Sequence, residues 1–215
     1  LSNLVNLSKA KFKNNYARAL CYQLFENNGV IKRETVYQII KNIYKDDRLN
    51  LRKVGVKIGR YHIFLPRMLK PSAVELRVKL WKLYFPKDEK NIIPKFGLNF
   101  IKDETKKNNN FLLICGFENF NKFYIRIDIL ERLFLKIINN TKNGAFKIDT
   151  DMINLIGCSK ENFFKLLKLM EYRPKKEKEE FFIYKPKLKK NRELKKKQKI
   201  SKNNPFEKLS ELRFR

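Results

Sequence analysis

The pattern of apolar and polar positions predicts several short helices in the first part of the chain. Over residues 16–27, apolar side chains recur at the i, i+3, i+4, i+7 spacing of one buried helix face, and Gly29 follows as a stop signal. Residues 33–43 repeat this spacing, and residues 46–53 form a third helical segment. The apolar residues between 56 and 65 then predict one or two short strands. Three helices followed by a strand pair outline a winged helix.

A further helix is expected after Pro71. Ser72 and Glu75 have the spacing of a capping box, and Pro86 ends the apolar pattern that follows them. We therefore expect residues 1–85 to form a helical lobe with a candidate β-wing. Residues 86–110 are rich in Lys, Asn and Asp and show no sustained period, which predicts a polar connection to a second compact part.

The second part, residues 111–187, has the sharper pattern. Asp128 and Glu131 have capping-box spacing at the start of a helix, and residues 144–146 suit a short strand. Residues 150–156 predict a short helix that stops at Gly157.

A tight turn separates this helix from the next one, which Ser159 caps. The side chains expected to point inward from it are Phe163, Leu166, Leu167 and Met170. Residues 171–174 and 180–186 then predict a β-hairpin. This order of elements predicts a winged helix-turn-helix. The expected fold class is mainly α with small β-hairpins (α+β), in two helical lobes.

Residues 188–215 are expected to form a basic tail. Nine Lys and Arg residues between positions 185 and 199 face a single acidic residue, Glu193. Self-repulsion keeps such a segment solvated unless it folds on a partner.

The composition points to an anionic partner. The chain has 215 residues, of which 43% are apolar, so it can bury a core. Fifty Lys and Arg against 22 Asp and Glu give a formal net charge of +28, which is typical of proteins that bind RNA or DNA. Lys, Asn and Ile are also favoured by genomes rich in A and T, so part of this charge reflects codon supply.

The cysteines favour a reducing, cytoplasmic location. Cys21, Cys115 and Cys158 are far apart and lack CxxC spacing, so neither a disulfide framework nor a zinc site is expected. No apolar run approaches the roughly 18 residues of a membrane span, and no membrane partner is expected. The chain begins with Leu1, which predicts that it is part of a longer protein.

The two closely spaced glycines at 55 and 59 raise the question of a phosphate-binding loop. They are one residue too close for a Walker A motif, and Arg60 and Tyr61 stand where that motif has Lys and Ser or Thr. We interpret the segment as a structural turn or wing. Lys53, Lys57 and Arg60 remain candidates for contact with a nucleic-acid backbone.

No catalytic residue and no metal site are predicted. His62 is the only histidine and has no partner in a metal-binding pattern, which favours a packed or surface histidine. Residues 103–106 (DETK) resemble the carboxylate pair of an ATPase but follow no apolar strand. A single histidine and isolated nucleophiles do not make a catalytic triad.

The helix capped by Ser159 is the best candidate for nucleic-acid contact. Its inward apolar set leaves Lys160, Lys165 and Lys168 facing out, as on a helix that enters a groove. Arg173, Lys175 and Lys176 continue the basic surface into the hairpin. Two plainer interpretations stay open: winged helices inside larger enzymes often only pack against neighbours, and a lysine-rich face is often merely solvated.

Several separated blocks of the chain carry a family resemblance. These blocks are ARALCYQLFENNGVIKRE, LRKVGVKIGRYHIFLPRMLKPSAVELRVKLW, IRIDILERLFLKI, GAFKIDTDMINLIGCSKENFFKLLKLMEYR and NPFEKL. Together they resemble the C-terminal region of bacterial superfamily 2 (DEAD/DEAH-like) helicases related to the mitochondrial degradosome RNA helicase. One departure is lysine in place of arginine throughout, which keeps the charge but loses bidentate phosphate geometry.

The resemblance implies an ATP-dependent unwinding enzyme whose motor domains lie upstream of Leu1 and bind ATP and Mg²⁺. The family's ATP-binding lysine, metal-binding carboxylates and arginine finger have no matching positions here, so no cofactor is expected in this chain. The region would guide a strand by backbone contacts and by stacking on aromatic side chains such as Tyr61 or Phe164. The alternatives are a stand-alone winged-helix DNA-binding regulator or replication factor, and a structural protein of a ribonucleoprotein particle.

Overall fold

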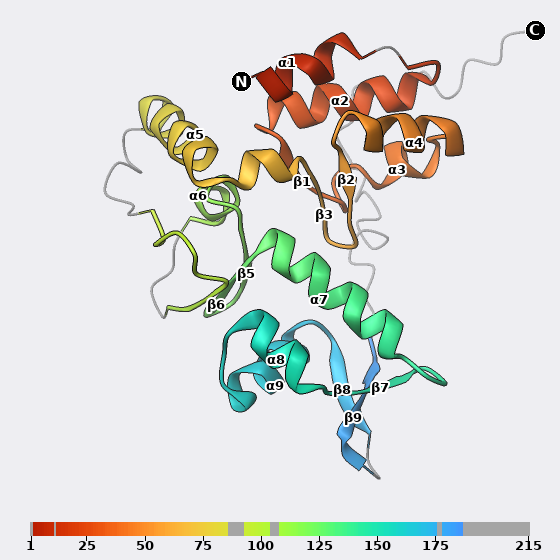
Figure 1. Cartoon of the computed structure of the whole chain (residues 1–215), viewed down its shortest axis with the longest axis vertical. Helices are drawn as coiled ribbons and strands as arrows, with labels where there is room; N and C mark the ends of the chain where they lie inside the picture. The colour runs from red at the N-terminus through yellow and green to blue at the C-terminus, as the bar shows by residue number, and fades with distance from the viewer. Residues whose placement is uncertain (1, 11, 86–92, 104–107, 176–177, 187–215) are drawn as a thin grey trace, which may run out of the picture. The chain divides into compact units, whose positions relative to one another are not determined.

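The protein combines helices with small antiparallel sheets, in agreement with the expected mixture of α and β structure. A computed structural model describes residues 2–10, 12–85, 93–103, 108–175 and 178–186 (Figure 1). Leu1–Lys185 form one compact unit and Pro186–Arg215 form another. The expected basic tail, residues 188–215, and the candidate contact residue Lys176 lie outside the described residues.

Short helices around a common apolar cluster make up the start of the chain. They are α1 (Ser2–Lys9), α2 (Asn15–Glu26), α3 (Tyr37–Lys41) and α4 (Lys45–Lys53). Leu20 and Leu24 of α2 pack with Ile40 of α3 and Leu51 of α4, and all four are buried. Burial of such side chains stabilises each helix by about 1.5–3 kcal/mol per residue, far more than its intrinsic propensity does.

The helix expected over residues 33–43 is shorter than its apolar pattern. The carbonyl oxygen of Lys32 accepts hydrogen bonds from the N–H of Thr35 (3.2 Å) and from its Oγ1 (2.7 Å). These bonds hold residues 33–36 in turns, so α3 begins only at Tyr37. A Thr hydroxyl competes with helix formation in this way because it offers the backbone a local partner.

A three-stranded antiparallel sheet follows these helices. Its strands are β1 (Val30–Lys32), β2 (Lys57–Ile58) and β3 (His62–Phe64), in the order β1-β3-β2. Lys32 pairs with His62 across the sheet, and Ile58 pairs with Ile63. The strand pair expected between residues 56 and 65 is therefore present.

A short 3₁₀ helix, η1 (Pro66–Leu69), leads into α5 (Pro71–Tyr84). The expected capping box at Ser72 is absent, since Lys70 occupies the N-cap position and no side chain caps the helix. Pro71 stands at the first helical position, where its missing N–H costs nothing and its fixed φ suits the helix. Arg77 is buried on α5 and donates from Nη1 to the Met68 carbonyl oxygen (3.0 Å). Burial lowers the pKa of Arg77 to about 10.

A second antiparallel sheet has the order β4-β6-β5. Its strands, with the helix between the first two, are β4 (Phe100–Lys102), α6 (Asn109–Ile114), β5 (Phe117–Phe120) and β6 (Phe123–Arg126). No strand is predicted from the sequence within residues 86–110, yet Ile101 of β4 pairs with Tyr124 of β6. Three residues are too few to show a period of two amid Lys and Asn, so only the long-range pairing reveals this strand.

The last described part runs helix, strand, two helices and a strand pair. The elements are α7 (Ile127–Asn140), β7 (Ala145–Lys147), α8 (Thr150–Ile156), α9 (Lys160–Leu169), β8 (Tyr172–Lys175) and β9 (Lys178–Tyr184). The strands form a third antiparallel sheet in the order β7-β9-β8.

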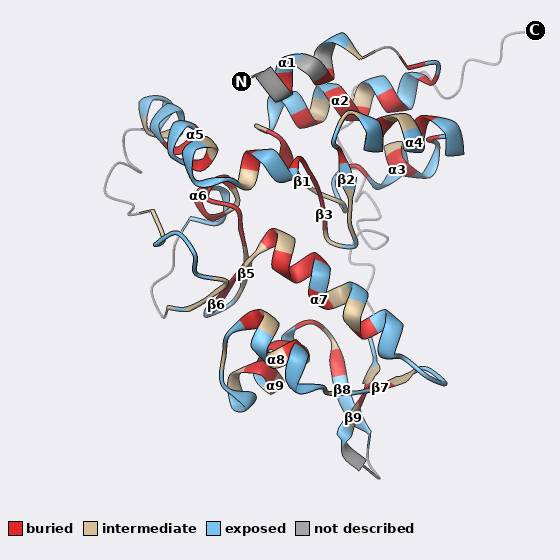
Figure 2. Cartoon of the chain, in the orientation of Figure 1, coloured by how far each residue is buried: buried red, intermediate tan, exposed pale blue. Residues whose placement is uncertain are grey.

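Local signals are confirmed in this part. Gly157 ends α8 in the left-handed region at φ +76°, and the Ser159 side chain accepts from the Asn162 N–H at the start of α9. The expected inward set, Phe163, Leu166, Leu167 and Met170, is buried. These side chains join α7, Met152 of α8 and Phe182 of β9 in one apolar cluster. Figure 2 shows buried positions on α7, α8, α9 and the sheet.

Within the described residues, no helix has both the length and the apolar character that crossing a lipid bilayer requires.

Candidate nucleic-acid interface

The turn between β2 and β3 wraps around a carboxylate of the same chain. Glu131, on α7, accepts hydrogen bonds from three consecutive backbone N–H groups: Oε2 from Arg60 (2.6 Å), and Oε1 from Tyr61 (2.8 Å) and His62 (2.8 Å). Successive N–H groups that point to one side form an anion site. The glycine-flanked turn therefore binds an anion, and that anion is the buried side chain of Glu131.

The two glycines of this turn have different reasons to be glycine. Gly55 has φ +90°, a conformation that side chains disfavour. Gly59 has no positive φ, but a Cβ added there would collide with the Glu131 carboxylate. The second glycine thus allows the carboxylate to approach the backbone. This confirms a structural turn.

Glu131 also corrects an expectation from local sequence. Asp128 and Glu131 do not form a capping box, because α7 begins at Ile127 with Arg126 at the N-cap position and no side-chain cap. Asp128 instead pairs with Arg126, with Arg126 Nε and Asp128 Oδ1 2.6 Å apart. Glu131 turns away from its own helix to residues about 70 positions earlier in the chain.

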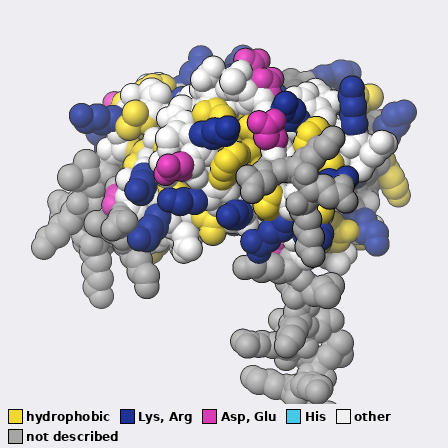
Figure 3. All heavy atoms as spheres, turned by 90° about the horizontal axis from the view of Figure 1, so that it is seen from below, with side chains coloured by type: hydrophobic (Ala, Val, Ile, Leu, Met, Phe, Trp, Pro, Cys, Tyr) yellow, Lys and Arg dark blue, Asp and Glu magenta, His cyan; other side chains and the backbone are white. Residues whose placement is uncertain are grey.

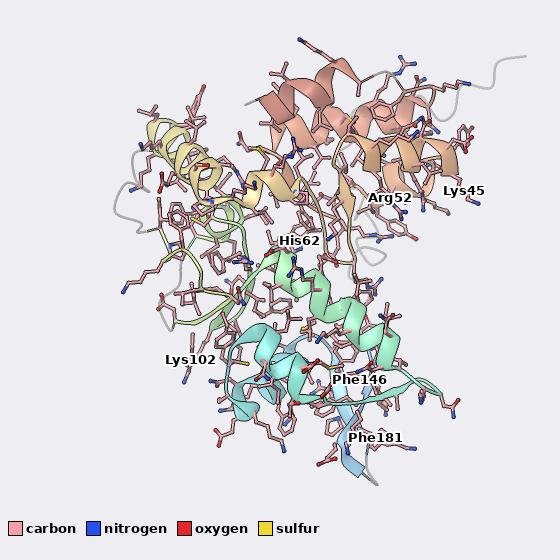
Figure 4. All side chains as sticks on the ribbon, viewed as in Figure 1. Lys45, Arg52, His62, Lys102, Phe146 and Phe181 are labelled. Atoms are coloured by element: carbon pink, nitrogen blue, oxygen red, sulfur yellow. The ribbon has the colours of Figure 1, made fainter. Side chains whose placement is uncertain are left out.

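His62 completes what we call the buried charge cluster, made up of Lys32, His62, Glu118 and Glu131. His62 is 1% exposed, and its Nε2 lies 2.8 Å from Oε2 of Glu118. The other oxygen of Glu118 accepts from Lys32 Nζ at 2.6 Å. Nδ1 of His62 lies 3.8 Å from Oε1 of Glu131, too far for a hydrogen bond, so Glu131 acts on the ring through its charge. Figure 4 shows His62 beside the first turns of α7.

The two carboxylates control protonation in this cluster. Burial alone lowers the pKa of His62, but the hydrogen bond to Glu118 and the two negative charges outweigh it and raise the pKa above its usual value. Burial raises the pKa of both glutamates, but His62 and the other donors outweigh it, so both pKa values end lower than usual. The arrangement favours an imidazolium between two carboxylates.

The candidate contact residues of the first part lie at the surface. Lys53 ends α4, Lys57 lies on β2, and Arg60 occupies the β2–β3 turn; all three side chains are exposed. The guanidinium of Arg60 lies over the Phe134 ring, 5.7 Å from its centroid. Glu131 thus places Arg60 on α7, whereas no contact joins Lys53 or Lys57 to the later candidates within the described residues.

The candidates on α9 are exposed as well. Lys160, Lys165 and Lys168 all face solvent, and Lys160 Nζ lies 5.7 Å from the centroid of the Phe164 ring. Phe164 itself packs on Phe182, with ring centroids 5.6 Å apart. Tyr61 and Phe164, the expected stacking residues, are both half-buried in contacts with other rings.

Arg173 and Lys175 lie two residues apart on β8, and both are exposed. Lys175 also lines an open cavity of about 770 Å³ beside β7. Lys142 and Lys147 line the same cavity, together with the side chains of Asn139 and Asn140. Lysine and amide side chains in a groove are suited to phosphate and sugar oxygens. Figure 3 shows Lys and Arg side chains, in dark blue, spread across one face of the molecule.

Comparisons with protein-family models, curated proteins and solved structures found no match to this chain. The resemblance to helicase C-terminal regions therefore rests on the sequence blocks quoted above.

Sequence reasoning missed the partners of His62. Glu118 and Glu131 look like ordinary surface or capping residues, because their partners come from distant elements. One signal was available: a lone histidine beside two glycines and an arginine needs a nearby anion if it is packed inside. Among the described residues, no group of three or more His, Cys, Asp or Glu side chains is arranged to hold a metal ion.

Proposed function

We propose that this chain is the C-terminal nucleic-acid-binding region of a superfamily 2 helicase, which contacts RNA or DNA while upstream motor domains hydrolyse ATP with Mg²⁺. In this proposal the chain acts in the cytoplasm, in keeping with cysteines that form no disulfide. The motor contributes the chemistry, and this region holds the strand by its backbone.

One observation carries the binding part of the proposal. Lys53, Lys57, Arg60, Lys160, Lys165, Lys168, Arg173 and Lys175 are all exposed. None of them forms an ion pair with a carboxylate in the described part of the chain. Unpaired cations at this density leave an anionic polymer as the partner that neutralises them best.

We further propose that residues 111–187 act as a winged helix. The order α7, β7, α8, α9, β8, β9 and the sheet order β7-β9-β8 support this assignment. In it, α9 occupies the recognition position and the β8–β9 hairpin is the wing. This assignment also keeps the alternative, a stand-alone DNA-binding regulator, because the exposed lysines of α9 would serve either protein.

Fluorescence anisotropy with labelled oligonucleotides tests the proposal. The purified 215-residue chain should bind single-stranded RNA or DNA, and log K should fall with log salt by about 0.7 per neutralised phosphate. Replacing Lys160, Lys165 and Lys168 together by Ala should weaken binding and flatten this slope. The matched control replaces three exposed lysines on other helices: Lys41, Lys45 and Lys79.

Two results would decide against the proposal. Equal losses in both triple variants would show that net charge alone drives binding. Strong preference for one duplex DNA sequence, with no binding to single strands, would favour the regulator. The chain alone should show no ATP hydrolysis, and an in-frame motor domain encoded upstream of Leu1 would support the helicase directly.

A further inference from the structure

A second, smaller cavity lies beside the clamped turn. Its volume is about 210 Å³, below the roughly 300 Å³ at which pockets for drug-sized ligands begin. Its lining comes from the β2–β3 turn, the end of α7 and all strands of the third sheet. The side chains that matter here are Arg60, Tyr61, Phe134, Phe146, Tyr172 and Tyr184. The volume and the aromatic walls suit one flat group.

The rings around this cavity form a continuous packed set that ends at the surface. Tyr61 meets Phe134 edge-on, with ring centroids 5.9 Å apart, and Phe146 meets Tyr172 edge-on at 5.4 Å. Tyr172 in turn contacts Tyr184 at 5.4 Å. Tyr184 is 45% exposed, whereas Tyr172 is buried. The Tyr184 hydroxyl donates to Oε2 of Glu171 (3.2 Å), which orients the exposed ring. An exposed ring backed by packed rings is a stacking platform.

Arg60 supplies charge at the edge of this cavity. Its backbone N–H is held by Glu131, and its guanidinium has no carboxylate partner among the described residues. A planar guanidinium beside aromatic rings can stack on a flat ligand and bind a phosphate with two parallel hydrogen bonds. A neutral apolar side chain of a peptide would use the rings but leave this cation unpaired.

We propose that this cavity takes one unpaired base of a single-stranded nucleic acid, stacked on Tyr184, with Arg60 on an adjacent phosphate. The site rests on the proposed nucleic-acid binding and deepens it, because it makes the chain a reader of single strands. Glu131 is then a positioning residue: it fixes the backbone from which Arg60 reaches the strand.

The experiment uses the 215-residue chain and a short uridine-rich RNA that carries one 5-iodouridine. Irradiation followed by mass spectrometry should place the cross-link on Tyr184 or Tyr172. In parallel, anisotropy should show that Tyr184→Leu weakens binding about tenfold, whereas Tyr184→Phe stays within about twofold. Tyr22→Leu, at an exposed tyrosine on α2, is the matched control and should bind like the wild type.

A variant of the RNA separates loss of stacking from loss of folding. An RNA series with one abasic position should include a member that binds about tenfold more weakly to the wild type, with no further loss on Tyr184→Leu. Arg60→Lys keeps the charge and should still weaken binding several-fold, because the planar fork is lost.

The outcomes distinguish the two proposals. Salt-dependent binding that is unchanged by Tyr184→Leu and by every abasic position, with cross-links elsewhere, overturns the base site and leaves the proposed function standing. Failure of the wild type to bind any RNA or DNA overturns both.

Discussion

Two groups of charged side chains in this protein differ in whether their charges are already paired. In the buried charge cluster, His62 and Lys32 face Glu118, and Glu131 faces three backbone N–H groups. On α9 and β8, exposed Lys and Arg residues have no carboxylate partner in the described part of the chain. The first group uses its interactions inside the molecule, and the second keeps them for a partner.

The difference teaches where function should be sought. A buried charge without a partner is costly, so the cluster must be complete for the fold to be stable. An exposed cation costs little when its partner is absent and gains energy when a phosphate arrives. We therefore expect substitutions in the cluster to change stability, and substitutions on α9 or β8 to change affinity.

The largest expected effect comes from Glu131→Gln. The amide offers one acceptor where the carboxylate offers two, and its NH₂ group opposes the N–H groups of Arg60, Tyr61 and His62. The free energy of unfolding should fall by about 3 kcal/mol, measured by urea denaturation. Glu161→Gln, at an exposed position on α9, is the control and should change it by less than about 0.5 kcal/mol. Equal effects would contradict the special status of the cluster.

Gly59→Ala should be the next largest. The new Cβ would occupy the space of the Glu131 carboxylate and push it off the turn, at a cost of about 1–3 kcal/mol. A double-mutant cycle with Glu131→Ala checks the cause. With the carboxylate removed, the Gly59→Ala substitution should cost much less, and purely additive losses would refute the steric explanation.

His62 should make stability depend on pH near neutrality. Its pKa is raised in the folded state, so its contribution is fully present below the unfolded value of about 6.5 and is lost as pH rises through the higher folded value. Glu118 and Glu131 have lowered pKa values, so their contribution is lost instead as pH falls below the usual carboxylate range.

Stability should consequently peak in mildly acidic solution. Urea denaturation across about pH 5–9 measures this, and His62→Gln should remove the decline on the alkaline side. Because the chain has a single histidine, NMR of one imidazole ring reports the folded pKa without assignment problems. A folded pKa below about 6.5 would contradict the proposed imidazolium.

The smallest stability effect is expected where the functional effect is greatest. Lys160, Lys165 and Lys168 replaced together by Ala should shift the free energy of unfolding by only about 0.5 kcal/mol, since exposed substitutions away from caps and cores rarely do more. A melting curve identical to wild type, beside a weakened nucleic-acid complex, is the expected pair of results. A large loss of stability would mean that these lysines are structural.

Local elements of the fold could be predicted from sequence. The apolar spacing of α2, the Ser159 cap, the Gly157 stop and the inward set of α9 are each decided by residues within two turns of one another. Where the deciding partner is local, periodicity and capping rules suffice. The exposure of the candidate lysines follows from the same periodicity.

The remainder depended on partners far along the chain. β4 becomes a strand only by pairing with β6, and Glu131 has helix-capping spacing but contacts the β2–β3 turn. The candidate base site needs Arg60 together with Tyr172 and Tyr184, which only the fold brings together. Local rules cannot describe such a site, since they see one segment at a time.

The turn held by Glu131 also bears on how the chain opens and closes. The amides of Arg60, Tyr61 and His62 bond to a residue 69 to 71 positions away. They can exchange hydrogen with solvent only when α7 withdraws, so they should exchange as slowly as the core amides of α7 itself. The first sheet and the last helical part would then unfold as a single cooperative unit, and a break between residues 62 and 131 would not yield two independent halves.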